Sequence, residues 1–224
     1  MDILLNVSAS AKIIEKIVIS GSKSESNRLL ILQQLFPEIS IDNLSDSDDS
    51  KHLQQALSTK ASFIDIGHAG TAMRFLVGYF SSKQNSEVIL TGSERMQQRP
   101  IGVLVEALRD LGADISYVEN EGYPPVRIKG KAITKDKVQI NGNVSSQYIS
   151  SLILMGTHLA KGVTIELMGE ITSIPYIKMT LSLLNQLGIS TYFEGNTIQV
   201  LPAKQLQKQT VVVESDWSSA SYFY

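Results

Sequence analysis

One short stretch of the sequence crowds a lysine, an arginine and three serines directly ahead of an apolar run. This stretch, Gly21–Arg28, reads GSKSESNR. Lys23 offers a compact positive charge and Arg28 a planar fork of hydrogen-bond donors, a pair that suits a phosphate or a carboxylate. Ser24 or Ser26 could instead cap a helix, so the residue types alone leave anion binding and ordinary capping both open.

Two further junctions between an expected strand and an expected helix carry related groups. Gly70 would let a ligand approach the backbone closely, and Thr71 could contact that ligand or cap the helix. Arg95 and Arg99 stand just before another expected helix, where the helix dipole disfavours a cation unless an anion lies nearby. A bound anion and an ordinary turn both remain possible at each junction.

Polar side chains recur at two later helix starts. Ser145, Ser146 and Gln147 open one expected helix, and Ser173 and Tyr176 lie at the start of another. Each group taken singly is typical of a cap. Because equivalent junctions of repeated units can converge, their recurrence predicts one shared polar face.

Other kinds of catalytic or binding centre find little support in the sequence. Asp46, Asp48 and Asp49 form an acidic cluster, which the start of a helix explains. Three scattered histidines and the absence of cysteine give no metal-ligand spacing, disulfide or thiolate nucleophile. We also find no Ser/His/Asp triad and no Walker-type loop.

The elements that must position these groups alternate between strand and helix patterns, which is typical of α/β or α+β folds. The expected helices cover residues 24–36, 45–57, 71–80, 99–112, 145–160 and 174–188. The expected strands cover residues 15–20, 39–44, 63–67, 87–92, 113–119, 125–130, 138–142, 163–167, 189–194, 197–201 and 211–213. Pro100 suits the first turn of its helix.

The order of these elements repeats along the chain. Gly112 and Gly188, which end two helices, are separated by nearly the same number of residues as the turn glycines Gly92 and Gly169. This spacing predicts duplicated βαβαββ units, preceded by a shortened third copy that opens at the strand near Ile17.

The overall composition is that of a globular protein with nearly balanced charge. The chain has 224 residues, 43% of them hydrophobic, and a formal net charge of -2. We therefore expect neither nucleic acid nor a membrane as a partner. No segment predicts a membrane span or a leader, so we expect a cytoplasmic protein.

Taken together, seven segments of the sequence resemble the EPSP synthase (3-phosphoshikimate 1-carboxyvinyltransferase) family. They run in the family's order over nearly the whole chain: GSKSESNR, LSDSDD, GHAGTAMR, GSERMQQRPIGVLVEALRDLGA, VSSQYISSLILM, SIPYI and ESDWSSASYF. The related UDP-N-acetylglucosamine enolpyruvyl transferases lack the first of these patterns. The resemblance implies lobes of three βαβαββ units and transfer of the enolpyruvyl group of phosphoenolpyruvate to the 5-hydroxyl of shikimate 3-phosphate, in aromatic amino acid biosynthesis, without a metal or organic cofactor.

The resemblance also implies a role for each matching residue. Lys23 would touch both substrates and is the one expected catalytic residue. Shikimate 3-phosphate would be held by Ser24, Arg28, Ser145, Ser146, Gln147, Ser173 and Tyr176. Phosphoenolpyruvate, or the inhibitor glyphosate, would face Gly70, Thr71 and Arg99. His68, Phe75 and Trp217 differ from the residues usual in the family, and the first two are expected to change the phosphoenolpyruvate pocket.

Family members are about twice as long as this chain, which implies a division into lobes. We expect residues 1–14 to be a stub of another lobe, residues 15–213 to form the substrate-binding lobe, and residues 214–224 to begin the other lobe. The catalytic Asp and Glu would then lie outside this chain, and the chain alone, expected to be a monomer, would be inactive. A non-catalytic sugar-phosphate binding module of the same fold is the alternative, and a nucleic-acid-processing protein is disfavoured by the acidic balance.

Overall fold

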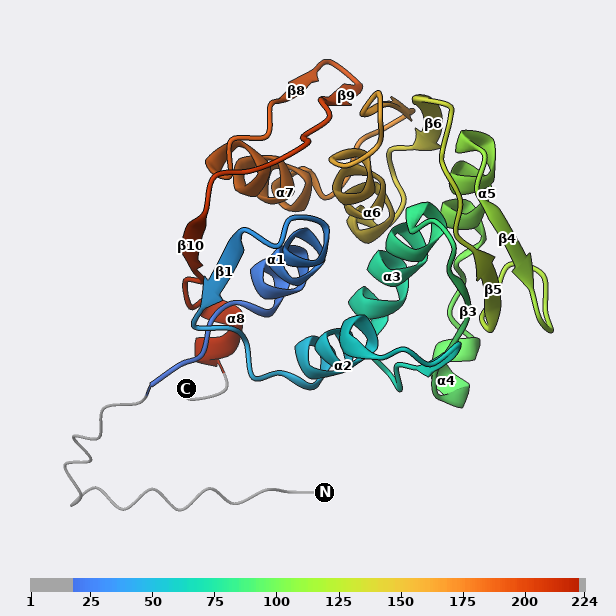
Figure 1. Ribbon diagram of the computed structural model, residues 1–224, viewed down its shortest axis with the longest axis horizontal. Helices are drawn as coiled ribbons and strands as arrows, with labels where there is room; N and C mark the ends of the chain where they lie inside the picture. Colours follow the sequence, from blue (N-terminus) through green and yellow to red (C-terminus); the bar gives the residue numbers. More distant parts are fainter. Residues whose placement is uncertain (1–17, 222–224) are drawn as a thin grey trace, which may run out of the picture.

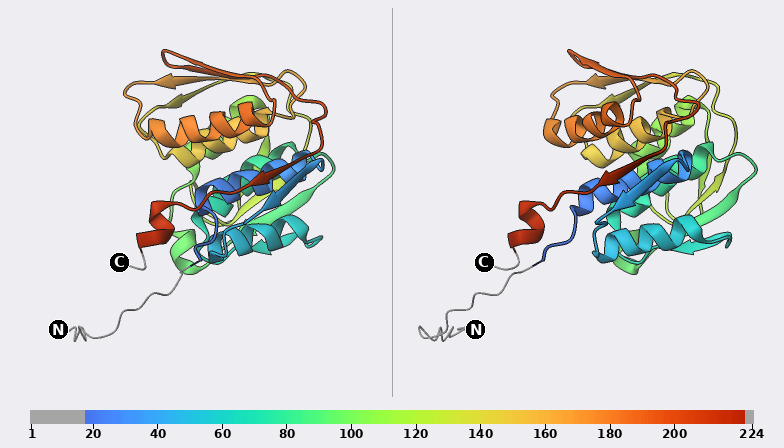
Figure 2. Two further views of the ribbon diagram at one scale, coloured as in Figure 1. Left: turned by 90° about the vertical axis from the view of Figure 1, so that its left-hand side faces the viewer. Right: turned by 60° about the vertical axis from the view of Figure 1, so that its left-hand side comes forward.

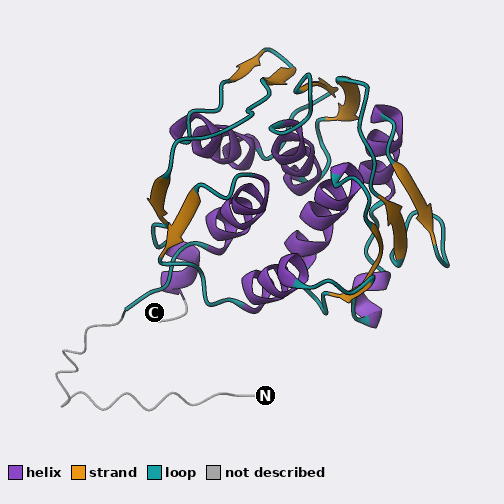
Figure 3. Cartoon of the chain, in the orientation of Figure 1, coloured by secondary structure: helices purple, strands orange, loops and turns teal. Residues whose placement is uncertain are grey.

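The computed structural model describes residues 18–221 of the chain and shows a mixed α/β fold (Figures 1 and 3). The helices are α1 (Lys23–Leu35), α2 (Asp48–Ser58), α3 (Gly70–Ser82), α4 (Glu94–Gln97), α5 (Gly102–Leu111), α6 (Ser146–Gly156), α7 (Ile174–Gln186) and α8 (Trp217–Ala220). The strands are β1 (Ile39–Asp42), β2 (Phe63–Asp65), β3 (Glu87–Thr91), β4 (Asp114–Tyr117), β5 (Val126–Lys129), β6 (Lys137–Asn141), β7 (Val163–Met168), β8 (Thr191–Glu194), β9 (Thr197–Val200) and β10 (Gln209–Val212).

Two four-stranded sheets share one topology. Their strand orders are β2-β3-β5-β4 and β6-β7-β9-β8. In each sheet the first pair of strands is parallel and the other two pairs are antiparallel. Both sheets therefore follow the βαβαββ order that the repeat in the sequence predicts, and the expected α/β class is confirmed.

The third, shortened unit stays a prediction. Strand β1 pairs in parallel with β10, so that Ile39 lies opposite Gln209 from the far end of the chain. The opening strand expected at residues 15–20 falls partly on residues 15–17, which lie outside the described residues. Residues 18–20 form no strand, so that part of the expectation is wrong.

Helices α1, α3 and α6 lie in the interior of the molecule, and the strands lie toward its outside (Figures 1 and 2). Every residue of α3 is buried, and α1 and α6 are buried along most of their length. An all-round apolar helix such as α3 is stable only when neighbours cover every side. The two serines at its end form hydrogen bonds within the helix: the hydroxyl of Ser81, for example, donates to the Val77 carbonyl at 2.6 Å.

Two expected helix boundaries are corrected by the structure. Pro100 precedes the N-cap of α5 and does not lie in its first turn, because the N–H groups of Ile101 and Gly102 both donate to the Gly122 carbonyl, at 2.8 and 3.1 Å. Helix α6 ends at Gly156, where the hydroxyl of Thr157 donates back to the Leu154 carbonyl at 2.7 Å. The short helix α4 was not expected.

Residues at the two ends of the described chain run side by side. The Ser22 N–H donates to the Glu214 carbonyl at 2.8 Å, and the Ser215 hydroxyl donates to the Ile19 carbonyl at 2.8 Å. Gly21 sits between them with no room for a side chain, because a Cβ there would lie 2.7 Å from Cγ1 of Val213. These contacts fix the position of the segment that leads into α1.

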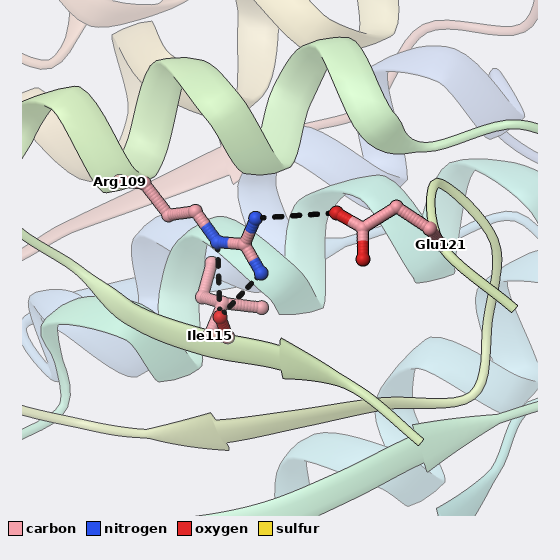
Figure 4. Close-up of polar contacts among 3 residues, drawn as sticks. All are labelled: Arg109, Ile115 and Glu121. Atoms are coloured by element: carbon pink, nitrogen blue, oxygen red, sulfur yellow. Dashed lines mark hydrogen bonds and ion pairs between the residues drawn. The ribbon is translucent and has the colours of Figure 1, made fainter. Parts of the chain in front are cut away.

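In another part of the molecule, Arg109 joins α5 to β4, the strand that follows it (Figure 4). Its Nε and Nη2 donate to the Ile115 carbonyl at 3.0 and 2.9 Å, and Nη1 lies 3.7 Å from a carboxylate oxygen of Glu121. The Glu121 side chain is 84% exposed, so the ion pair adds little to stability. The hydrogen bonds of Arg109 therefore belong to the scaffold.

Candidate functional site

Four helices meet around the guanidinium group of Arg28. Its Nε donates to Oγ1 of Thr180 in α7 at 2.7 Å, its Nη2 donates to Oγ of Ser150 in α6 at 3.1 Å, and its Cζ lies 5.5 Å from the ring centre of Phe75 in α3. Arg28 and these three residues all lie in the second turn of their own helices. The N-termini of α1, α3, α6 and α7 therefore open toward one region, where their dipoles add positive potential.

Arg28 is a buried cation, with 2% of its surface exposed. Its Nη1 donates to the Ser24 carbonyl at 2.7 Å, and it forms no ion pair with another described residue. Burial lowers the pKa of Arg28 to about 10, so the side chain is still charged at neutral pH. A buried charge without a counter-ion is unfavourable, which makes this region receptive to an anion.

Ser26 and Asn27 hold the loop that leads into α2. The Ser26 hydroxyl accepts the Ser45 N–H at 2.9 Å, and Oδ1 of Asn27 accepts the Ser50 hydroxyl at 2.8 Å. Helix α1 begins at Lys23 with Ser22 at its N-cap position, and the Ser22 side chain makes no capping bond. The interpretation of Ser24 or Ser26 as the cap of α1 is therefore wrong.

A cavity of about 590 Å³ opens between the starts of α1 and α7. Lys23, Ser24 and Tyr176 contribute donors to its wall, and Asp46 and Asp216 contribute carboxylates. The remaining lining residues are Val18, Ile19, Ser20, Ser45, Ser47, Ser218 and Ser219.

A second cavity, of about 330 Å³, lies at the start of α3. It brings together five residues that the sequence predicts for substrate binding: Lys23, Gly70, Thr71, Arg99 and Gln147. The other lining residues are Ser47, Asp48, Asp49, His68 and Ala69. Lys23 lines both cavities and is exposed.

Contacts within the second cavity hold α3 against its neighbours. The side-chain amide of Gln147 donates to the Thr71 hydroxyl at 3.2 Å, which ties α6 to α3. The guanidinium of Arg99 lies over the Cα of Gly70, where a Cβ would be 2.9 Å from Cζ of Arg99. Gly70 is thus required for the close approach of Arg99.

The structure does not bring Arg28, Ser145, Ser146 or Ser173 into either cavity. Ser145 is exposed at the N-cap of α6, where its hydroxyl accepts the Gln147 N–H at 3.4 Å. Ser173 is exposed at the N-cap of α7 and has left-handed backbone angles, φ 56 and ψ 27. Such a conformation is uncommon for a residue other than glycine. Both serines border the starts of two helices that contact one another through Ser150 and Thr180, at 3.0 Å.

Arg74 lines neither cavity but supports the second one, a role that the sequence did not predict. It is 4% exposed, and its Nη1 and Nη2 donate to the carbonyls of Gly70 and Pro100, at 3.0 and 3.2 Å. Burial, followed by the nearby Arg99 charge, lowers the pKa of Arg74. The available signal was a cation one helical turn after Gly70. Arg74 joins the start of α3 to the loop that carries Arg99.

The three residues that depart from the family pattern lie in different surroundings. His68 is exposed in the wall of the second cavity, and its ring centre lies 6.0 Å from that of His52. Phe75 is 1% exposed, packs beside Arg28 and lines neither cavity. Trp217 is 80% exposed at the start of α8.

The converging helix starts, the two polar cavities and the repeated units define an α/β protein with its polar cavities at the starts of its helices. A family model described as EPSP synthase (3-phosphoshikimate 1-carboxyvinyltransferase) matches residues 53–224. The chain belongs to this family.

Relatives in sequence agree with this assignment, and a solved structure shares the fold. The chain is 47% identical over 219 residues to a 3-phosphoshikimate 1-carboxyvinyltransferase of Bacteroides fragilis (strain YCH46), covering 97% of this chain and 53% of the relative. A protein of the same name from Colwellia psychrerythraea is 38% identical, over 98% of this chain and 58% of its own length. The solved EPSP synthase from Acinetobacter baumannii has the same fold, with a TM-score of 0.75 and 24% identity over 93% of this chain and 52% of that one. The chain thus spans about half the length of the curated relatives it matches.

No helix among the described residues is both long and apolar enough to cross a membrane.

Proposed function

We propose that this chain forms the substrate-binding lobe of an enzyme that transfers the enolpyruvyl group of phosphoenolpyruvate to the 5-hydroxyl of shikimate 3-phosphate. The observation that carries the proposal is the position of Lys23 between two polar cavities. Shikimate 3-phosphate would lie along the starts of α1, α6 and α7, beside Ser24, Arg28 and Tyr176. Its phosphate would face the starts of α6 and α7, at the exposed Ser145 and Ser173 and the buried Ser146.

Phosphoenolpyruvate would occupy the cavity at the start of α3. Gly70 and Thr71 present first-turn N–H groups there, and Lys23 and Arg99 supply positive charge. In the proposed reaction the 5-hydroxyl loses its proton and its oxygen adds to C2 of phosphoenolpyruvate while C3 takes up a proton. The C2–O bond to phosphate then breaks as C3 loses a proton, which restores the C2=C3 double bond and releases inorganic phosphate. Lys23 and Arg99 would stabilise the charge on the departing phosphate, and the two-cavity arrangement would hold the reactants side by side.

The adjacent end segments of the described chain support the proposed division into lobes. Residues 15–213 would form this lobe, and residues 1–14 and 214–224 would belong to a second lobe that supplies the catalytic Asp and Glu. The paired segments at Ser22 and Glu214 support a two-stranded connection at this point. The complete enzyme would act as a cytoplasmic monomer without a metal or organic cofactor.

Substitution of Lys23 tests the proposed function. Lys23→Ala removes an exposed cation from both cavities, so binding of both substrates should weaken roughly ten- to a hundredfold, the range of a charge-assisted hydrogen bond. The measurement is titration of each ligand followed by amide NMR shifts, with Lys60→Ala, an exposed lysine in the α2–β2 loop, as the matched control. Unchanged affinity for both ligands in Lys23→Ala would contradict the proposal.

The alternative is a binding module of the same fold that holds a sugar phosphate and takes no part in catalysis. The larger cavity beside Ser24 and Tyr176 is compatible with it. It predicts that shikimate 3-phosphate binds whereas phosphoenolpyruvate does not, so the same titration separates the two functions.

A further inference from the structure

The first turn of α2 connects α1 and α3, two helices whose first residues line the second cavity. The Ser50 hydroxyl donates a hydrogen bond to Oδ1 of Asn27 in α1 at 2.8 Å. Its neighbour Asp49 accepts a hydrogen bond from the Ala72 N–H of α3 through Oδ2 at 3.3 Å. Lys23 stands on α1 and Gly70 begins α3. The position of Lys23 relative to Gly70 therefore depends on two adjacent residues of α2.

The start of α3 needs an acceptor from outside its own sequence. The N-cap residue is Ala69, which has no polar side chain and makes no side-chain capping bond. The N–H groups of Gly70, Thr71 and Ala72 are the first three of the helix and have no intrahelical partner. Asp49 accepts the hydrogen bond of the third group, the Ala72 N–H. Neither the Gly70 nor the Thr71 N–H has a protein acceptor among the described residues.

Asp49 also stands in a cavity whose other features favour anions. Lys23, Arg99 and the start of α3 are all positive, whereas Asp48 and Asp49 are negative. On charge alone a carboxylate here should repel phosphoenolpyruvate. Asp49 differs from Asp48 in one respect: its carboxylate accepts a hydrogen bond from α3, whereas the Asp48 carboxylate accepts none from another described residue.

We propose that Asp49 is a positioning residue that caps α3 from α2 and thereby leaves the Gly70 and Thr71 N–H groups directed at the phosphoenolpyruvate site. This inference rests on the proposed function of the second cavity. The carboxylate weakens the attraction of the cavity for anions, and its capping bond outweighs that loss because it fixes two donors at once.

Neutral substitutions of Asp49 separate its charge from its hydrogen bond. Asp49→Asn keeps an oxygen acceptor at the same distance and removes the charge, so phosphoenolpyruvate should bind as tightly as in the wild type or more tightly. Asp49→Ala removes both, and binding should weaken roughly three- to tenfold, the equivalent of one hydrogen bond. Asp48→Ala, the matched variant, removes an equal charge from the same cavity and should strengthen binding.

The experiment is an NMR titration with phosphoenolpyruvate in the presence of shikimate 3-phosphate, together with amide hydrogen exchange at Ala72. Exchange at Ala72 should be slow in the wild type and in Asp49→Asn and faster in Asp49→Ala. Tighter binding in both alanine variants would overturn the inference, because charge alone would then explain the cavity, and so would unchanged Ala72 exchange. If the wild type shows no shift with phosphoenolpyruvate, the proposed function itself fails.

Discussion

The guanidinium of Arg99 lies over the Cα of Gly70, so close that a Cβ at residue 70 would stand 2.9 Å from Cζ of Arg99. Gly70 also begins α3, whose start faces the second cavity. The backbone N–H groups at the start of α3 and the guanidinium of Arg99 therefore lie around the same cavity. The absence of a side chain at residue 70 is what permits this arrangement.

Gly70→Ala should displace Arg99 from the second cavity. Because Arg99 supplies a charge-assisted contact, we expect phosphoenolpyruvate affinity to fall roughly tenfold or more while affinity for shikimate 3-phosphate changes little. Titration with each ligand checks this. Gly102→Ala is the control, since a Cβ there meets its nearest atom at 3.4 Å. Equal losses for the two ligands would argue against a local effect on Arg99.

Arg28 should be needed more for binding than for folding. Arg28→Met keeps most of the side-chain volume and removes a buried charge that has no ion pair, but it also removes three hydrogen bonds, so it should lower the free energy of unfolding by about 1–3 kcal/mol. Arg28→Ala also leaves a cavity and should lower the free energy of unfolding by about 2–5 kcal/mol. Both variants should bind shikimate 3-phosphate more weakly than the wild type. Urea unfolding and calorimetric titration measure the two effects, and equal affinity in wild type and Arg28→Met would refute the role of Arg28.

His158 should make stability depend on pH. Burial lowers the pKa of His158 below its ordinary value of 6.5. Below that pH the unfolded chain takes up a proton that the folded chain resists, so stability is lost as pH falls through 6.5 and on toward the lower pKa of the folded state. His158→Gln should reduce this loss, measured by urea unfolding above and below pH 6.5. A variant with the full wild-type loss would show that other groups cause it.

The chain alone should release no phosphate from phosphoenolpyruvate in the presence of shikimate 3-phosphate. The proposed active site draws its acid–base groups from a second lobe, and the chain spans about half the length of its curated relatives. A phosphate-release assay on the purified chain tests this, and turnover would contradict the division into lobes.

Most of the fold could be predicted because its periodic signals are local. The apolar runs and the helix-ending Gly112 and Gly188 mark two units, and both appear with the same strand order. The start of α5 was missed because it depends on hydrogen bonds to Gly122, a partner that lies beyond the helix in sequence.

The residues of the site were predictable only where a polar residue or a glycine stands at the start of an expected helix. Gly70, Thr71, Arg99 and Gln147 meet in one cavity with Lys23, as their places before or within helix starts indicate. The role of Asp49 was not predictable, because its hydrogen bond to Ala72 joins two different helices. An acidic residue in the first turn of α2 is also accounted for by the dipole of that helix alone. The burial of Arg28 was not predictable either, because its hydrogen-bond partners Ser150 and Thr180 lie on helices that are far from α1 in the sequence.

Calorimetric titration of the 224-residue chain with shikimate 3-phosphate tests the central claim most directly. The starts of α1, α6 and α7 should give saturable binding at one site per chain, and shikimate, which lacks the phosphate, should bind far more weakly. A folded chain that shows no saturable binding, or that binds shikimate as tightly as its phosphate ester, would contradict the account.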